Sequence, residues 1–304
     1  MSSRDPRGWR PRWLQVGHRT QTRAAGSGAR AAVRPIRKAV SVTVDLPVCG
    51  DLPWARLLGY LQPRLIPGVE RVDDISYQRA CNGGQVRVTA DSASSARSLR
   101  IEAPSTAAAD EAVPRVAHLF AVHEDLSAAR RHLRRCPDLA PRIAGFPGLR
   151  PLGSWDAFEL CVRTVIGQQV TVAAAGTLTA RVVERCSGEL SPARLLSADL
   201  NQLGMPGKRV DTLRQLASAV VEGRLHLAAA DWSVIDAQLQ ALPGFGPWTR
   251  HYLAIRLGRE PDAFPHSDIG LIRAAGCASP KALLQRAEAW RPYRALAAIY
   301  LWAA

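Results

Sequence analysis

The chain has 304 residues, 47% of them hydrophobic, which suits one large or two modest domains with a substantial core. Its net charge of +14 suits a polyanionic partner, most simply nucleic acid. A coding bias toward arginine is the competing explanation, because only three of the 40 basic residues are lysine. No apolar run approaches the roughly 18 residues of a transmembrane helix, which excludes an integral membrane protein.

The first 40 residues hold nine arginines and Lys38 against one acid, Asp5, a net charge of +9 that leaves +5 for the rest. They lack the apolar core of a secretion signal, and their composition predicts a disordered basic tail. The six cysteines stand singly, which excludes an iron–sulfur or zinc ligand set and a dense disulfide framework. These features indicate a cytoplasmic protein.

Residues 41–109 are predicted to form a small α+β domain with an antiparallel sheet. Alternating apolar and polar residues predict strands at 41–46, 75–80, 85–90 and 98–103. Asn82-Gly83-Gly84 suits a hairpin turn between two of them. Apolar residues at helical spacing predict a helix over 52–65, and the Ser/Ala-rich segment 105–109 is interpreted as a linker.

From residue 110 onward the pattern is helical, so residues 110–304 are predicted to form an all-α domain. Short turns with Gly or Pro separate the expected helices. These helices are expected at 111–120, 126–136, 155–166, 170–186, 191–195, 199–203, 208–222, 232–242, 247–257, 268–275, 280–290 and 294–302. The predicted fold class is therefore α+β, with a small sheet domain followed by a larger helical domain.

The sequence LPGFGPWT at 242–249 predicts a tight hairpin between two helices. Gly244 and Gly246 permit positive φ, and Pro247 suits the first position of the next helix. Successive backbone N–H groups at such a helix N-terminus form an anion site that suits a DNA phosphate. The alternative is an ordinary helical hairpin in which Pro and Gly only mark the turn.

Asp268 stands at the expected start of a helix, within DAFPHSDIGLIR at 262–273. An Asp at this position commonly caps the helix, and capping is favoured when Asp268 is taken alone. Trp248 and Tyr252 share a helix face because they are four residues apart, and Trp302 lies near the end of the chain. Burial in the core is the alternative role for each aromatic.

Together, the hairpin, an Asp 20 residues beyond its Trp and a late Trp resemble the helix-hairpin-helix DNA glycosylase superfamily. The resemblance is closest to its bacterial 3-methyladenine DNA glycosylase II family, and it leaves residues 1–40 outside. The segments that carry it are LPWARLLGYLQPRLIPGVERVDDISYQRA (52–80), GLRPLGSWDAFELCVRTVIGQQVT (148–171), LGMPGKR (203–209), LPGFGPWTRHYLAIR (242–256), DAFPHSDIGL (262–271) and WRPYRALAAIYLW (290–302).

The resemblance implies a TBP-like sheet domain and a helix-hairpin-helix glycosylase domain. It implies an enzyme that flips alkylated bases, such as 3-methyladenine and 7-methylguanine, from duplex DNA and hydrolyses the N-glycosidic bond to begin base excision repair. Asp268 matches the catalytic Asp, which stabilises an oxocarbenium-like sugar. Trp248, Tyr252 and Trp302, with Tyr60 of the N-terminal domain, match aromatics of a base pocket whose electron-rich faces attract a cationic base.

The same resemblance implies the contacts with DNA. Gln169 matches the wedge that fills the gap left by the flipped base, although relatives can carry an apolar residue there. The alternative is that Gln168 and Gln169 only cap or cross-link helices. Ile269 stands where an aromatic can occur. The matched DNA-binding residues of the hairpin are Gly244, Phe245, Gly246 and Thr249. The implied partner is duplex DNA with alkylated bases, and the chain is expected to be a monomer associated with the nucleoid.

Bifunctional members of the superfamily carry a Lys at the position of Trp248, where it forms a Schiff base with the sugar. None of the three lysines stands there, so the resemblance implies a monofunctional enzyme without lyase activity. No required cofactor and no iron–sulfur cluster are expected. Family hairpins often bind a monovalent cation through backbone carbonyls, which here would be those of Gln240, Leu242 and Phe245.

Two other functions stay open at this point. A non-catalytic DNA-binding or regulatory protein would keep the hairpin and the basic tail, although Asp268 together with the matched aromatics argues against a purely binding role. An enzyme for deaminated or oxidised bases would usually show more polar residues at the matched pocket positions.

Overall fold

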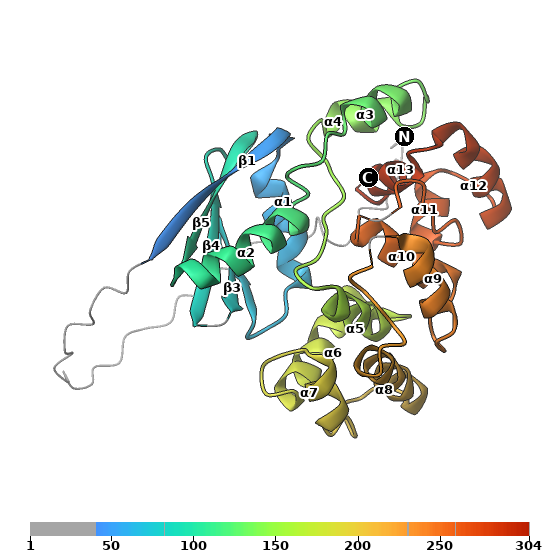
Figure 1. Cartoon of the computed structure of the whole chain (residues 1–304). Helices are drawn as coiled ribbons and strands as arrows, with labels where there is room; N and C mark the ends of the chain where they lie inside the picture. Colours follow the sequence, from blue (N-terminus) through green and yellow to red (C-terminus); the bar gives the residue numbers. More distant parts are fainter. Residues whose placement is uncertain (1–40, 82, 230, 259, 304) are drawn as a thin grey trace, which may run out of the picture.

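The computed structural model describes residues 41–304 apart from residues 82, 230, 259 and 304. The predicted basic tail, residues 1–40, and Asn82 of the predicted turn therefore lie outside the described residues. Figure 1 shows a sheet with a helix lying across it, joined to a larger body of helices that contains the C-terminus.

A five-stranded antiparallel sheet forms the N-terminal part, with the strand order β1-β5-β4-β3-β2. Its strands are β1 (Val42–Leu52), β2 (Glu70–Val72), β3 (Ser76–Cys81), β4 (Gly84–Ala90) and β5 (Ala96–Ala103). Residues at alternate positions face the core, as Val88 and its partner Ile101 do, and these two side chains are fully buried. The predicted antiparallel sheet is confirmed, and β2 is too short to show alternation in the sequence.

Two helices share a core with this sheet. The predicted helix over 52–65 is divided into α1 (Trp54–Leu61) and a short 3-10 helix, η2 (Gln62–Arg64), because Pro63 has no backbone N–H with which to continue α1. The prediction of a linker at 105–109 is wrong, because α2 (Thr106–Leu119) begins there and its alanines favour a helix. The Ser105 hydroxyl caps α2 by accepting a hydrogen bond from the Ala108 amide at 3.2 Å. The shared core extends to Trp155.

The rest of the described chain is helical. Its α-helices are α3 (Ser127–Leu133), α4 (Ala140–Gly145), α5 (Ala157–Gly167), α6 (Val172–Arg185), α7 (Pro192–Ser197), α8 (Gly207–Val221), α9 (Trp232–Gln240), α10 (Pro247–Arg256), α11 (Ile269–Ala274), α12 (Pro280–Ala287) and α13 (Arg294–Trp302), and a 3-10 helix, η3 (Glu288–Trp290), follows α12. The helix predicted at 199–203 is a turn instead, in which the Asp199 carboxylate accepts from the Asn201 amide at 3.0 Å. The helix predicted at 126–136 is α3, which is shorter than expected. The sequence pattern did not predict α4.

Two hydrophobic cores support the helical part, and α10 lies between them. Leu253 packs in the core that α10 forms with α5, α6, α8 and α9. Ala254 and Ile255 pack in the core that it forms with α11, α12 and α13. Because α10 is held on two sides, its preceding hairpin and its side chains are fixed in place. No helix in the described part of the chain is long and apolar enough to cross a bilayer.

Candidate active site

The predicted hairpin joins α9 to α10, which lie next to each other in Figure 1. Gly244 has φ +86°, a conformation that L side chains avoid, and α10 begins at Pro247. Gly244 also lies against α8, since a Cβ atom there would be 2.8 Å from Thr212 Cγ2. The ring of Phe245 is buried and anchors the turn in the core, whereas Gly244 and Gly246 are exposed.

Gly244→Ala is expected to destabilise the fold by about 2 kcal/mol, because the new Cβ combines a disfavoured positive φ with a collision against Thr212. Gly246→Ala is the matched control, since Gly246 has φ −66° and nothing within 4 Å of its Cβ position. Urea unfolding of both variants measures the difference. Equal free energies of unfolding would contradict this view of the hairpin.

Asp268 lies at the N-terminus of α11, and its carboxylate accepts three hydrogen bonds. The Leu271 amide donates to Oδ1 at 2.8 Å, which is the helix-capping role. The indole Nε1 of Trp302 donates to Oδ1 at 3.1 Å, and that of Trp248 donates to Oδ2 at 2.9 Å. Capping is therefore only one of its roles, because two aromatic side chains also fix this half-buried carboxylate.

The three predicted aromatics of the helical part meet in one place. Trp248 and Tyr252, one turn apart on α10, are stacked with 5.4 Å between ring centroids and 6° between ring planes. Trp302 of α13 meets Tyr252 edge-on, with 6.1 Å between centroids and 65° between planes. We call Trp248, Tyr252 and Trp302 the aromatic cluster. Each of its rings is half-buried, and Asp268 lies at its edge as the acceptor for both indoles.

Tyr60 of α1 is connected to this cluster through Arg256, a residue that sequence reasoning missed. Arg256 Nη1 donates to Tyr60 Oη at 2.9 Å. The buried Arg256 guanidinium lies 5.7 Å from the ring centroid of Tyr60 and 6.0 Å from that of Tyr252. The spacing of four residues between Tyr252 and Arg256 on one helix face is the pattern that could have identified it.

Gln168 and Gln169 have different surroundings. Gln168 Nε2 donates to the Gly244 carbonyl at 2.8 Å and to Thr249 Oγ1 at 3.1 Å, so it links the end of α5 to the hairpin. Arg209 of α8 donates to the Gln168 carbonyl at 2.6 Å. The cross-linking alternative therefore fits Gln168. Gln169 is exposed and has φ +58°, an uncommon value for a residue with a side chain.

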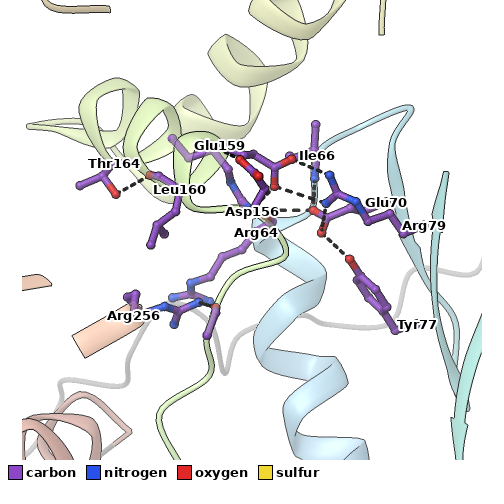
Figure 2. Close-up of polar contacts among 12 residues, drawn as sticks. Arg64, Ile66, Glu70, Tyr77, Arg79, Asp156, Glu159, Leu160, Thr164 and Arg256 are labelled. Atoms are coloured by element: carbon purple, nitrogen blue, oxygen red, sulfur yellow. Dashed lines mark hydrogen bonds and ion pairs between the residues drawn. The ribbon is translucent and has the colours of Figure 1, made fainter. Parts of the chain in front are cut away.

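A buried ion cluster joins the sheet to α5 (Figure 2). Arg79 of β3 donates to Glu159 of α5 at 2.5 Å and to Glu70 of β2 at 3.1 Å. These three side chains are at most 7% exposed. Glu70 also accepts from the Tyr77 hydroxyl at 2.7 Å and from the Ile66 amide at 2.8 Å. The cluster therefore ties the loop after η2 to both parts of the protein.

The carbonyls predicted to bind a monovalent cation lie at the end of α9 and in the turn after it. The Leu242 carbonyl accepts from the Phe245 amide at 3.5 Å, and the Phe245 carbonyl accepts from Arg250 Nη1 at 3.2 Å. The Arg250 guanidinium therefore already supplies positive charge at one of the predicted ligands. Among the residues that the structure describes, no three His, Cys, Asp or Glu side chains are grouped to hold a metal ion.

The fold and the site together define a class of protein. The family described as "AlkA N-terminal domain" matches residues 43–156, and the family described as "HhH-GPD superfamily base excision DNA repair protein" matches residues 162–278. The chain is thus built as a helix-hairpin-helix base excision repair protein. It is 34% identical over 267 residues to DNA-3-methyladenine glycosylase 2 of Escherichia coli. The aligned region covers 82% of this chain and 93% of that protein. The chain belongs to this family of DNA glycosylases, which are hydrolases.

Further relatives and solved structures agree with this placement. A Mycobacterium tuberculosis protein named as a probable bifunctional transcriptional activator and DNA repair enzyme AlkA is 32% identical over 297 residues, 90% of this chain and 60% of that protein. The structure of a 3-methyladenine DNA glycosylase from Archaeoglobus fulgidus matches with a TM-score of 0.72 at 18% identity, and covers 85% of this chain and 97% of that one. The structure of the 3-methyladenine DNA glycosylase Mag1 of Schizosaccharomyces pombe, in complex with abasic DNA, matches with a TM-score of 0.52 at 22% identity. The match covers 58% of this chain and 95% of that one. The predicted family and fold class are confirmed.

Proposed function

We propose that the chain is a monofunctional DNA glycosylase that flips alkylated bases, of the 3-methyladenine or 7-methylguanine type, out of duplex DNA and hydrolyses their N-glycosidic bonds. One observation carries the proposal: the Asp268 carboxylate is held between the indole N–H groups of Trp248 and Trp302. A fixed negative charge therefore stands at the edge of an aromatic surface, where a cationic base can stack and its sugar can meet the carboxylate.

The proposed chemistry needs little assistance at the leaving group. A purine alkylated on a ring nitrogen carries positive charge, and it leaves as a neutral base when its bond to C1′ breaks. The sugar becomes an oxocarbenium-like cation, which the Asp268 carboxylate stabilises before water adds to C1′. Because three donors already fix this carboxylate, it does not have to reorganise as the cation forms.

Recognition of the base is assigned to the aromatic cluster and Tyr60. Electron-rich ring faces attract a cationic base by stacking and cation–π contact. The indole N–H groups of Trp248 and Trp302 are both taken by Asp268, so these side chains offer ring faces rather than polar edges. Such a surface senses charge deficiency more than hydrogen-bond pattern, which supports a broad range of alkylated bases.

The hairpin and the loop after α5 are the proposed contacts with DNA. Gly244 and Gly246 are exposed next to the N-terminus of α10, where backbone N–H groups suit a phosphate. The side chains of Phe245 and Thr249 are buried, so contacts from these two residues would come from their backbone. Gln169 is the proposed wedge, because it is exposed at a positive φ on a loop that is linked to the hairpin.

The proposed reaction is simple hydrolysis, since Trp248 stands where bifunctional members carry the Lys that forms a Schiff base. The enzyme is proposed to need no cofactor and no iron–sulfur cluster, and to act as a cytoplasmic monomer associated with the nucleoid. A monovalent cation on the carbonyls of Gln240, Leu242 and Phe245 is part of the proposal. Its role would be to stiffen the hairpin beside Arg250.

A non-catalytic DNA-binding protein explains the site less well. Capping of α11 requires only the bond between Asp268 and the Leu271 amide. A protein that only binds DNA has no use for two further indole donors that fix the same carboxylate beside stacked rings. The arrangement of Asp268 therefore favours catalysis over the binding alternative.

DNA treated with a methylating agent tests the proposed function. Incubation with the full chain is expected to release 3-methyladenine and 7-methylguanine as free bases, which chromatography identifies. The strands should stay intact until alkali is added, because no lyase step follows. DNA binding without base release would favour the non-catalytic alternative, and strand breaks without alkali would contradict a monofunctional reaction.

Removal of residues 1–40 is expected to weaken nonspecific DNA binding and to flatten its salt dependence. The segment carries a net charge of +9, and each phosphate contact contributes about 0.9 to the slope of log K against log salt concentration. Binding titrations between about 50 and 200 mM salt measure the slopes of the two chains. A full-length variant with Gln in place of the tail arginines controls for length. Identical slopes for all three would mean that the tail does not touch DNA.

A further inference from the structure

Arg256 is a buried cation without a carboxylate partner. It is 8% exposed, and its Nη1 and Nη2 atoms donate to Tyr60 Oη at 2.9 Å and to the Gly153 carbonyl at 3.0 Å. Its Nε atom has no hydrogen-bond partner, and no acid within the described part of the chain forms an ion pair with this guanidinium. Burying a charge without an opposite charge costs free energy. Its place between Tyr60 and Tyr252 therefore indicates a function.

The hydroxyl of Tyr60 keeps a proton that is free to be donated. Its oxygen accepts from Arg256, and no group in the described chain accepts a hydrogen bond from it. The Arg64 guanidinium lies over the ring, 4.0 Å from its centroid. Figure 2 shows Arg64 and Arg256 beside the chain segment that leads into α5. Arg163 of α5 donates to the Arg64 carbonyl and brings a third cation to this side of the site. The side chain of Tyr60 is half-buried, and a hydroxyl with cations around it and an uncommitted proton is suited to act as a donor.

The same charges change the acidity of this hydroxyl. Burial raises the pKa of Tyr60, but attraction to Arg256, Arg64 and Arg163 and the hydrogen bond from Arg256 outweigh burial and lower the pKa below its ordinary value of 10.0. Tyr252 is the other titratable group that faces Arg256. A phenol with a lowered pKa is the stronger hydrogen-bond donor as long as it is protonated.

We propose that Tyr60 is a general acid that speeds the release of uncharged bases by this enzyme, with Arg256 as the positioning residue that orients its hydroxyl. The inference rests on the proposed glycosylase function and adds a catalytic group to it for bases that carry no charge. A cationic alkylated purine leaves as a neutral base without added protons. An uncharged purine, such as hypoxanthine, would leave as an anion unless a proton reaches it.

The proposed step moves one proton out and one proton back. As the bond between C1′ and the ring nitrogen breaks, its electron pair goes to the base, and the Tyr60 hydroxyl proton bonds to a ring nitrogen of that base. Asp268 stabilises the sugar cation while the oxygen of water bonds to C1′, and one proton of this water returns to the Tyr60 phenolate. The products are the neutral base and an abasic sugar. Between the two transfers Arg256 neutralises the phenolate, which accounts for a buried guanidinium without an acid.

Tyr60→Phe tests the proposal, because it keeps the ring and removes only the hydroxyl. Single-turnover rates are measured for full-length wild type and variant on two matched duplexes, one with hypoxanthine and one with 7-methylguanine. The ratio of the hypoxanthine rate to the 7-methylguanine rate is expected to fall about 100-fold. Tyr300→Phe is the matched control, since Arg130 donates to the Tyr300 hydroxyl at 3.3 Å within the core that includes α13. Its ratio should equal that of wild type.

Arg256→Met adds a readout that a purely structural role would not change. In wild type, hypoxanthine release should decline as the pH rises through the lowered pKa of Tyr60, because the acid form is lost. Without the Arg256 cation, the pKa of Tyr60 moves back toward its ordinary value, so the decline should begin at higher pH. The rate–pH profiles of both proteins on hypoxanthine measure this shift.

The outcomes separate this inference from the function on which it rests. If Tyr60→Phe lowered the rate of base release equally on both duplexes, the acid role would be overturned and Tyr60 would be a stacking residue. Release of 7-methylguanine but not hypoxanthine by wild type would also overturn it, while the glycosylase function would stand. Release of neither base would overturn both.

Discussion

Asp268→Asn is expected to lower the single-turnover rate of base release by about 100- to 1000-fold while DNA affinity stays close to that of wild type. Asn keeps the size of the side chain and can still cap α11 through the Leu271 amide. It carries no charge to stabilise the sugar cation, and its amide nitrogen would face the donor of Trp248 or Trp302. Rates on a duplex with one 7-methylguanine, together with fluorescence anisotropy for binding, measure both quantities.

Asp231→Asn is the matched control for this variant. Asp231 caps α9 by accepting from the Ser233 amide at 2.8 Å, and it is exposed. The same substitution at this second helix cap should leave both the rate and the affinity unchanged. If Asp268→Asn lost folding, binding and activity together, Asp268 would be a helix cap and not a catalytic residue.

Arg79→Met is expected to lower the free energy of unfolding by about 3–5 kcal/mol. The substitution leaves the buried carboxylates of Glu70 and Glu159 without the guanidinium that lies between them. Arg163 compensates for this loss only in part, because its Nη1 atom is 3.9 Å from Glu70 and 3.7 Å from Glu159, beyond hydrogen-bond distance of both. Burial raises the pKa of Glu159 even with Arg79 present, so the ionised form is already costly to hold. Urea unfolding at pH 8 measures the loss.

The loss should shrink as the pH falls, because protonation removes the uncompensated charge of Glu159, whose pKa is raised in the folded state. Arg100→Met is the matched control in the same sheet, since Arg100 of β5 and Asp45 of β1 form an exposed ion pair at 2.8 Å. Its denaturation midpoint should stay close to that of wild type. An Arg79→Met protein as stable as wild type at pH 8 would mean that the ion cluster does not hold the two parts together.

Local patterns predicted the hairpin and the helix face that Trp248 and Tyr252 share. The hairpin follows from the order of Gly and Pro, and the stacking of Trp248 on Tyr252 follows from their spacing on one helix. The hydrogen bond from Trp302 to Asp268 is different, because these residues are 34 positions apart and meet only when α13 packs against α11. The family resemblance supplied that pairing, which no periodicity in the sequence could.

The residues that sequence reasoning missed are charged residues in an arginine-rich chain. Arg79 and Glu159 are 80 positions apart, and nothing in their local sequence shows that folding buries them together. Arg256 is equally inconspicuous, since its role depends on a contact with Tyr60, 196 positions away. The prediction of a linker at 105–109 was wrong for another reason. Ser and Ala are common in linkers, but Ser before a run of Ala also suits a helix with a Ser cap.

The most direct test of hydrolysis without a covalent intermediate uses one duplex with a single 7-methylguanine. The full chain is incubated with it, and half of the reaction is treated with borohydride, which traps any Schiff base between protein and sugar. The expected result is free 7-methylguanine, an unbroken strand with an abasic site, and no trapped adduct. A trapped adduct or a strand break at the lesion would contradict hydrolysis supported by Asp268, and a bound duplex with no base released would contradict the glycosylase function.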